Sequence, residues 1–414
     1  MRSAAWAAAV AAAVLAGVLA VALAVRQEPG DGKFRPQAFT FVVGSDLHIG
    51  VKGSKEDGDT NTYKNAKKFV KFLNNWDENK LKWPEDLGGD DVQRPQGVIL
   101  TGDLVNDGGE PDLVKGQWDK YTKLFAPIKG DAKLDYDVYE GAGNHDGGSV
   151  EPDLHSMHPD ESDVPRQAIV ANNANRAQRV HTSRNGLHYS WDWGPIHFVM
   201  LNLYPGKQRS EDLEDTDEMS NMEPDHALEF LKRDLRDHMG DVMWNGRILH
   251  RHAVLLHHLG VDHHSRERWT DEERAEYADV IKKYNVMAIF HGHDHEPKFY
   301  EWEGVNVFNG PSVSLDDEHF PKVEGRKHHY QFLVASVEVR DPYHFHTNWG
   351  KIRFRVAEWS TLHGKKGDGS DGDWGLTFIQ EVVPSPDVAG RGGVSAWVAR
   401  GYQYLRSLVP GRKA

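Results

Sequence analysis

Five short segments of the sequence place His, Asp and Asn side chains directly after apolar runs. They are SDLH, which ends at His48, TGD at Asp103, GNHD at Asp146, LLHH at His258 and FHGHDH at His295. Imidazole, carboxylate and amide groups are ligands for transition metals such as zinc, iron, manganese and nickel. A solvated loop could explain any one segment, but the five together predict a metal centre.

The composition narrows the chemistry that this centre can support. The 414 residues include no cysteine, which excludes thiolate ligands, a cysteine nucleophile and disulfide bonds. Acidic residues outnumber basic ones by 63 to 49, for a formal net charge of -14. Such a surface repels phosphate backbones, so a nucleic-acid partner is not expected.

Spacing within the segments indicates how the ligands could be presented. Residues i and i+2 of an extended segment point the same way, so Asp46 with His48, and His293 with His295, can each place two ligands on one face. Asp103 is the lone carboxylate at the end of its strand, and is a natural bridge between two cations.

Alternating apolar runs and helical patterns predict the elements that must position these segments. Buried strands are expected at 39–43, 97–100, 137–140, 253–256 and 286–290, and amphipathic helices at 66–73, 114–125, 228–235 and 270–281. This alternation predicts helices that cover a largely parallel sheet, in which ligands gather beyond the carboxyl ends of the strands. Residues 187–204 predict an antiparallel hairpin, and the later strands, with no helices between them, suggest more antiparallel sheet.

The N-terminal residues form a separate segment. Ala4 to Val25 is an unbroken apolar run that Arg26 closes, long enough to cross a bilayer and preceded by a charged start. We interpret residues 1–30 as a signal peptide or an uncleaved membrane anchor with a short linker. This predicts an exported protein in the periplasm, the cell envelope or the extracellular space, held at the membrane if the segment is not cleaved.

The remaining chain divides into a catalytic domain, expected at 36–385, and a C-terminal tail at 386–414. Within the tail, apolar residues fall near one face of a predicted amphipathic helix. That helix could pack on the domain or lie on a membrane surface.

The ordered series Asp-x-His, Gly-Asp, Gly-Asn-His-Asp, His and Gly-His-x-His, between Phe39 and Glu296, resembles the calcineurin-like metallophosphoesterase superfamily. The resemblance implies an α/β fold in which two mixed β-sheets pack face to face with flanking helices, an αββα sandwich. It also implies a pair of metal ions. The first would be bound by Asp46, His48, Asp103 and His295, and the second by Asp103, Asn144, His257 and His293.

The resemblance assigns one further role and leaves one position open. His145 would face the substrate as a proton donor. Many relatives read His-x-Pro at the fourth motif, whereas this sequence reads His257-His258-Leu259-Gly260. The first histidine aligns as the ligand, which leaves His258 as its neighbour or as a substrate contact.

The function that the resemblance implies is hydrolysis of phosphate esters by in-line attack of a hydroxide that bridges two metal ions. A phosphomonoesterase is expected. The alternatives are a phosphodiesterase for small diesters, nucleotides or lipid phosphates, and a catalytically inactive binding relative. The metal could be Mn, Fe, Zn or Ni, although Asn106 stands where purple acid phosphatases have a tyrosine that binds iron. The sequence does not indicate the oligomeric state. Within the insertion after Asp146, no residue stands out as a candidate for the site, and this includes Arg166 and Arg176.

Overall fold

The computed structural model describes residues 37–51, 62–147, 164–176, 178–207, 224–244, 247–262, 265, 269–314, 330–340, 351–361 and 372–382. The chain divides into two units, Met1–Pro36 and Gln37–Ala414. The expected signal or anchor segment and the expected C-terminal tail both lie outside the described residues. Within the described ranges, no helix is both long and apolar enough to cross a membrane.

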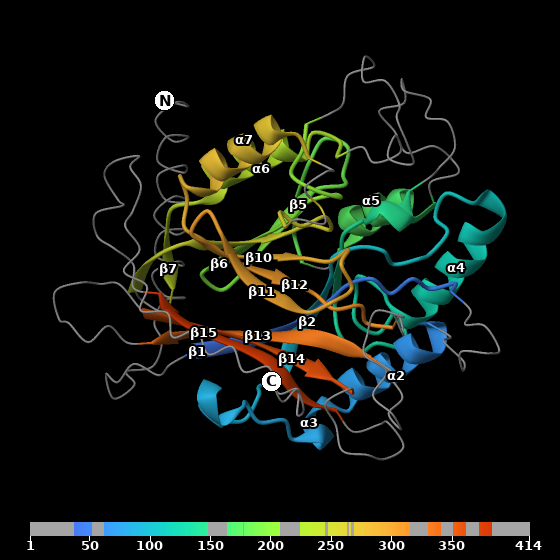
Figure 1. Cartoon of the computed structure of the whole chain (residues 1–414), viewed down its shortest axis with the longest axis horizontal. Helices are drawn as coiled ribbons and strands as arrows, with labels where there is room; N and C mark the ends of the chain where they lie inside the picture. The colour runs from blue at the N-terminus through green and yellow to red at the C-terminus, as the bar shows by residue number, and fades with distance from the viewer. Residues whose placement is uncertain are drawn as a thin grey trace, which may run out of the picture. The chain divides into compact units, whose positions relative to one another are not determined.

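Two mixed β-sheets form the centre of the second unit (Figure 1). The six-stranded sheet has the order β15-β14-β13-β1-β2-β3, formed by β1 (Gln37–Gly44), β2 (Pro95–Leu100), β3 (Val138–Glu140), β13 (Gln331–Arg340), β14 (Lys351–Ser360) and β15 (Asp373–Val382). The seven-stranded sheet has the order β11-β12-β10-β9-β6-β5-β4, formed by β4 (His181–Thr182), β5 (Tyr189–Trp193), β6 (Ile196–Met200), β9 (His252–Leu256), β10 (Val286–His291), β11 (Lys298–Trp302) and β12 (Val305–Asn309). A separate pair joins β7 (Asp241–Trp244) to β8 (Arg247–His250).

Helices cover the outer faces of both sheets. The helices are α2 (Thr62–Asn74), α3 (Trp76–Asn79), α4 (Pro111–Leu124), α5 (Val164–Asn175), α6 (Ala227–His238) and α7 (Asp271–Ile281), with short 3-10 helices at Glu85–Leu87 and Asn144–Asp146. Apolar side chains of α2 and α4 pack in one core cluster with strands of the six-stranded sheet. Those of α6 and α7 pack with strands of the seven-stranded sheet, and Figure 1 shows these two helices together on that side. The expected αββα architecture is confirmed.

Side-chain alternation along the strands separates the cores. On β1, Phe41 and Val43 enter the core between the sheets, whereas Val42 packs toward the helices of the six-stranded sheet. On β9, Val254 and Leu256 enter the core between the sheets, and Ala253 and Leu255 face α6 and α7. Both faces of these strands are buried, which explains their continuous apolar sequences.

Strand directions bring the carboxyl ends of several strands to one edge. Strands β1, β2 and β3 are parallel to one another, as are β6, β9, β10 and β12. The predicted hairpin is present, since β5 and β6 pair antiparallel across a turn at Gly194, which has a φ of 58°. Strand β12 departs from the expected antiparallel pattern, because it runs parallel to β10 and antiparallel only to β11.

A buried histidine fastens the hairpin to α6. His197 on β6 lies 2.8 Å from Asp192 Oδ1 through Nδ1, and 2.7 Å from Asp234 Oδ2 through Nε2. Burial lowers the pKa of His197, but hydrogen bonds to the two carboxylates outweigh it and raise the pKa above the ordinary value of 6.5. The protonated ring therefore bridges β5, β6 and α6.

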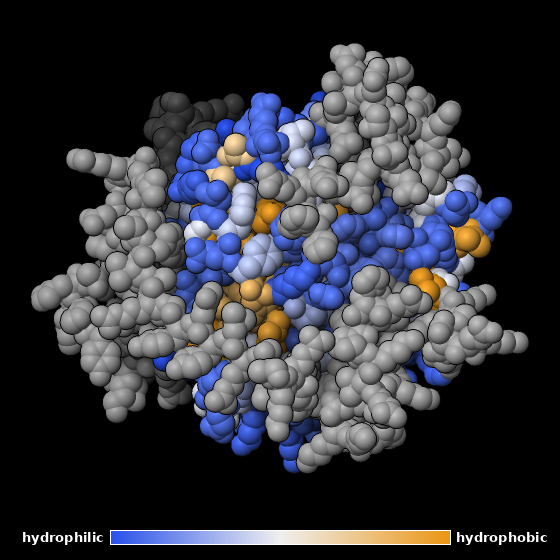
Figure 2. Space-filling view, viewed as in Figure 1, coloured by the Kyte–Doolittle hydropathy of each residue, from blue (hydrophilic) through white to orange (hydrophobic). Residues whose placement is uncertain are grey.

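The outer surface of the described residues is mostly polar. In Figure 2, hydrophilic residues dominate the visible coloured surface, and hydrophobic residues gather only in small groups. Among the described residues, Leu113 on α4 is the single large hydrophobic side chain that is exposed.

Candidate metal centre

The five polar segments converge where the carboxyl ends of strands from both sheets meet. The backbone N–H of Asp46, after β1, donates to the carbonyl of Gly102, after β2. The N–H of Gly292, after β10, donates to the carbonyl of His258, after β9. The two groups touch each other as well, since the N–H of His293 donates to the Asp46 carboxylate at 3.1 and 3.2 Å.

The first cluster consists of Asp46, His48, Asp103 and His295. Each offers one potential ligand atom, and these atoms lie within 4.8 Å of one another. His48 Nε2 is 3.4 Å from Asp103 Oδ2, and His295 Nε2 is 3.4 Å from Asp46 Oδ1. The Nε2 atoms of His48 and His295 face each other at 3.2 Å, a contact that needs a shared proton or a cation between them.

The second cluster shares Asp103 with the first. Asp103, His258 and His293 offer ligand atoms that also lie within 4.8 Å of one another. His258 Nε2 is 3.2 Å from Asp103 Oδ2 and 3.0 Å from the side-chain oxygen of Asn144. Asn144 therefore adjoins this cluster.

The structure does not bring His257 to either cluster, in contrast to the expected ligand set. Strand alternation turns His257 toward the helices, where its Nδ1 donates to the carbonyl of Leu259 at 2.7 Å. Its Nε2 lies 3.3 Å from the hydroxyl of Tyr277 on α7. His258 occupies the position expected for His257. Its side chain points to the same side as those of Val254 and Leu256, which lie between the sheets.

The residues fit a pair of cations, and the most direct indication is Asp103 Oδ2. This atom is buried and accepts no hydrogen bond of good geometry. It lies within 3.4 Å of imidazole nitrogens from both clusters, His48 on one side and His258 on the other. The charge of such a buried carboxylate has to be offset by a nearby cation, either the protonated ring of His258 or a metal ion that takes its place.

Electrostatics favour the metal-binding forms of His48 and Asp46 but hold His258 in its protonated form. Burial lowers the pKa of His48 to about 4, so its ring is neutral near pH 7. Burial raises the pKa of Asp46, but the rings of His295 and His258 outweigh it and bring the pKa down to about 2. Burial lowers the pKa of His258, but Asp103 and Asp46 outweigh it and raise the pKa to about 9. A cation at the second cluster would therefore displace a proton from His258.

Five ligand candidates have left-handed backbones, which a strand-like segment would not have. The φ angles are 53° for Asp46, 42° for His48, 51° for Asp103, 76° for His293 and 61° for His295. The expected extended geometry is thus wrong, although Asp46 and His48 still reach the same cluster. Non-glycine residues in this conformation cost about 1–3 kcal/mol each and are typical of functional sites.

Glycines give the ligands room at two close approaches. A Cβ on Gly292 would lie 2.6 Å from Asp46 Oδ2 and would overlap Ser45 Oγ. A Cβ on Gly143 would overlap the Asp103 carboxylate. Both loops therefore require glycine for the ligands to approach the backbone.

Two residues of the Gly-Asn-His-Asp segment hold the centre together. Asp146 Oδ1 accepts the N–H groups of Leu104 at 2.9 Å and Val105 at 3.0 Å, which joins the loops after β2 and β3. The backbone N–H of His145 donates to Asp103 Oδ1 at 2.8 Å. Its ring donates through Nδ1 to the carbonyl of Asn106 at 2.8 Å and lies 4.6 Å from the ring of His48, between centroids.

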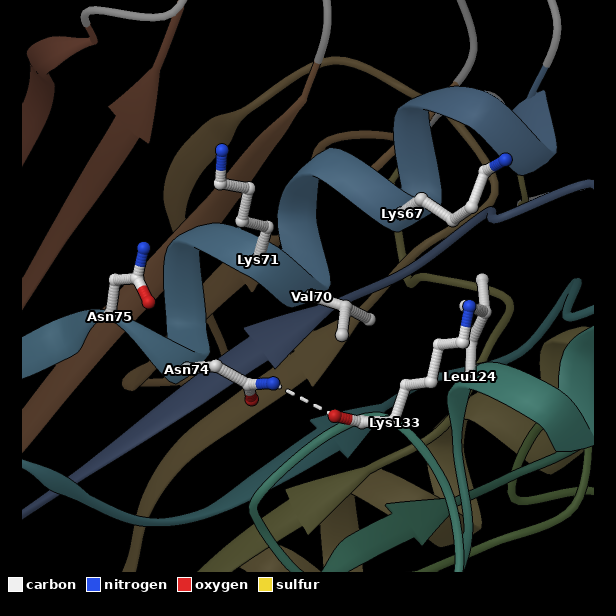
Figure 3. A pocket seen from close by; sticks show the side chains of 7 residues that line it. All are labelled: Lys67, Val70, Lys71, Asn74, Asn75, Leu124 and Lys133. Atoms are coloured by element: carbon white, nitrogen blue, oxygen red, sulfur yellow. Dashed lines mark hydrogen bonds between the residues drawn. The ribbon is translucent and has the colours of Figure 1, made fainter.

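A shallow groove beside α2 has no part in this centre. Its lining residues are Lys67, Val70, Lys71, Asn74, Asn75, Leu124 and Lys133. Figure 3 shows that Lys67 and Lys71 point apart. The Asn74 amide is already used, since it donates to the carbonyl of Lys133 at 2.8 Å.

Comparison with known proteins identifies the family to which the chain is similar. A family model described as calcineurin-like phosphoesterase matches residues 39–297. Comparison with curated proteins gave no match. A solved dimetal phosphatase from Danio rerio is similar at 16% identity, with 72% of this chain and 95% of that chain covered and a TM-score of 0.44. A purple acid phosphatase from yellow lupin seeds is similar at 14% identity, with 82% and 53% covered and a TM-score of 0.43.

The family model spans more than half of the chain. Its matched range, 39–297, contains all five polar segments and both clusters. The chain belongs to the calcineurin-like phosphoesterase family.

Proposed function

We propose that this protein hydrolyses phosphate monoesters with two transition-metal ions. One ion would be held by Asp46, His48, Asp103 and His295, and the other by Asp103, Asn144, His258 and His293. The observation that carries the proposal is the buried Asp103 Oδ2, which lies within 3.4 Å of imidazole nitrogens of both clusters and accepts no hydrogen bond of good geometry. When bound, two such ions neutralise phosphoryl charge and lower the pKa of a bound water.

The protein's own residues supply orientation and a proton. Asp103 provides the negative charge that both sites share, and its Oδ1 fixes the backbone of His145. The hydrogen bond from Nδ1 to Asn106 fixes the imidazole plane and leaves Nε2 as the nitrogen that can pass a proton to the departing oxygen. No nucleophilic serine or cysteine is required.

The first experiment compares a nitrophenyl monoester with a bis(nitrophenyl) diester on metal-loaded protein. We expect the monoester to have the higher kcat/KM. Faster turnover of the diester would identify a phosphodiesterase instead. Turnover of neither ester, with both metals bound, would favour an inactive binding relative.

The second experiment tests His145 as the proton donor. An alkoxide is a strong base and needs a proton to leave, whereas a nitrophenolate does not. We predict that His145→Ala loses about 10²–10⁴-fold in rate on alkyl phosphates and much less on nitrophenyl phosphates, with both metals retained. Equal losses on both would mean that His145 stabilises phosphoryl charge, and loss of metal would make it structural.

The metal ions are expected to be Mn, Fe, Zn or Ni, since the ligand set contains oxygen and imidazole donors only. Element analysis of the purified protein identifies them. A content of calcium or magnesium alone would contradict the proposed ligand chemistry.

We further propose that residues 1–30 direct export, so that catalysis occurs outside the cytoplasm. The support is the apolar run from Ala4 to Val25 with its charged start. Deletion of residues 1–26 should leave a soluble, active enzyme. Full-length protein with its catalytic domain in the cytoplasm would refute the localisation.

A further inference from the structure

Arg166 lies at the outer end of the turn that carries Asn144 and His145. It is the third residue of α5. Its Cδ is 3.9 Å from the position that a Cβ on Gly147 would take, and Gly147 directly follows the turn. A residue from the long insertion thus reaches the catalytic turn, which the sequence alone could not indicate.

Buried polar contacts connect helix α5 to β3, the strand that leads into this turn. Asn172 donates to Glu140 Oε1 at 2.7 Å, and Arg176 Nη2 lies 3.5 Å from the same oxygen. Glu140 is the last residue of β3, and the side chains of Arg176 and Glu140 are only 2% and 1% exposed. This buried attachment fixes the position of Arg166 relative to His145.

The guanidinium of Arg166 contacts a second segment of the chain, formed by Asn202, Leu203 and Asp225. It forms an ion pair with Asp225, and Asn202 donates to the same Asp225 oxygen at 3.3 Å. The next residue, Leu203, donates its N–H to the carbonyl of Ala142 and accepts the N–H of His258. The ion pair is therefore connected to the loops that carry the second cluster.

His188 connects Asn202 to Asp225 through two hydrogen bonds. Its Nδ1 accepts the backbone N–H of Asn202 at 3.0 Å, and its Nε2 donates to the carbonyl of Asp225 at 2.8 Å. Burial lowers the pKa of His188 to about 4, so the ring stays neutral near pH 7 and keeps this tautomer.

We propose that Arg166 binds an anionic substituent on the leaving group of the substrate, such as a carboxylate or a second phosphate. This inference rests on the proposed function. If His145 protonates the departing oxygen, a substituent that extends from that oxygen past the turn toward Gly147 would reach Arg166. A guanidinium binds carboxylate and phosphate through paired N–H donors, and the Arg166 side chain is 16% exposed, so a ligand would bind it beside its Asp225 partner.

Because Arg166 and Asp225 carry opposite charges, replacing one or the other should change the affinity for an anionic leaving group in opposite directions. Removing the cation should weaken binding of an anionic leaving group, whereas removing the Asp225 carboxylate should strengthen it. If the pair were only structural, Arg166→Gln and Asp225→Asn would lower activity alike, whatever the substrate.

The test uses two esters that differ by a carboxylate in place of a methyl group, phosphoglycolate and ethyl phosphate. We expect wild-type protein to prefer phosphoglycolate in kcat/KM. The ratio should fall about tenfold or more in Arg166→Gln, rise in Asp225→Asn and stay unchanged in Arg233→Gln, an exposed arginine on α6. A wild-type enzyme without this preference, or an unchanged ratio in Arg166→Gln, would overturn the proposal.

A binding measurement separates this proposal from the proposed function. Phosphonopropionate and propylphosphonate are non-hydrolysable counterparts of the two esters, and calorimetry gives their affinities for metal-loaded and chelator-treated protein. If neither ester is hydrolysed, the proposed function fails, but the role of Arg166 is still decided. A preference for phosphonopropionate that Arg166→Gln abolishes would support it, and equal affinities in wild-type protein would overturn it.

Discussion

Replacing each of two adjacent histidines by alanine separates the candidate ligand from its neighbour. His257 and His258 are both 0% exposed and follow the same strand, so His257→Ala and His258→Ala remove the same atoms from equally buried sites. The two variants differ only in what the ring contacts. His258 faces Asp103 and Asn144, whereas His257 contacts Leu259 and Tyr277.

Both variants should lose stability, and His258→Ala should lose more of it. In His257→Ala, two hydrogen bonds are lost, at about 1 kcal/mol each, and a buried ring leaves a cavity that costs about 1–2 kcal/mol more. His258→Ala loses its contacts with the Thr101 carbonyl at 3.2 Å and with Asn144 at 3.0 Å, and also its ion pair with Asp103 at 3.2 Å, so without metal it should cost more than His257→Ala. A loss of about 3 kcal/mol lowers the melting temperature of a large domain by about 6–12 °C. Thermal unfolding in the presence of a chelator measures this.

Metal content should distinguish them. We expect His257→Ala to retain two ions per chain, and His258→Ala to fall to about one, as measured by element analysis after gel filtration. One ion in His257→Ala and two in His258→Ala would refute the assignment from strand alternation. Equal loss from both would mean that stability, and not ligation, controls the metal content.

Three further predictions test other parts of the account. Asp103→Asn should lower metal content at both sites, because both share its charge, and full occupancy in this variant would contradict the bridging role. Gly292→Ala should cost about 1–3 kcal/mol and lower metal content, since its Cβ would lie 2.6 Å from Asp46 Oδ2, whereas Gly116→Ala in α4, with no neighbour within 4 Å, should be neutral or stabilising. His197 has a raised pKa, so its stabilising contribution is complete below pH 6.5 and is lost as pH rises through the folded-state pKa. Urea unfolding should therefore show that His197→Asn costs more in acidic than in alkaline buffer, and a cost independent of pH would disprove the charged bridge.

Much of the fold could be predicted because local patterns and tertiary packing agree. The helix predicted over 270–281 is α7, and a capping box begins it, with the Thr270 hydroxyl accepting the N–H of Glu273. The hairpin around Gly194 could be predicted from its turn residues. The parallel pairing of β12 with β10 could not, because β12 reaches its place through β11 and no helix marks the crossover.

The site was less predictable where two residues competed for one role. Strand β9 is apolar on both faces, so nothing in its sequence tells which face lies between the sheets, and hence whether His257 or His258 enters the centre. The left-handed backbones of the ligands could not be predicted either, because Asp and His adopt this conformation more often than most residues but still in a minority of cases, so residue type alone does not indicate it. Arg166 could not be ranked, since only the attachment of α5 to Glu140 brings it to the turn.

The most direct test of the central claim is a metal titration of chelator-treated protein while hydrolysis of a nitrophenyl phosphate is followed. Two ions that share Asp103 predict that activity is absent without metal and reaches its plateau at about two equivalents per chain. Activity without metal, or a plateau at one equivalent, would contradict a dinuclear centre.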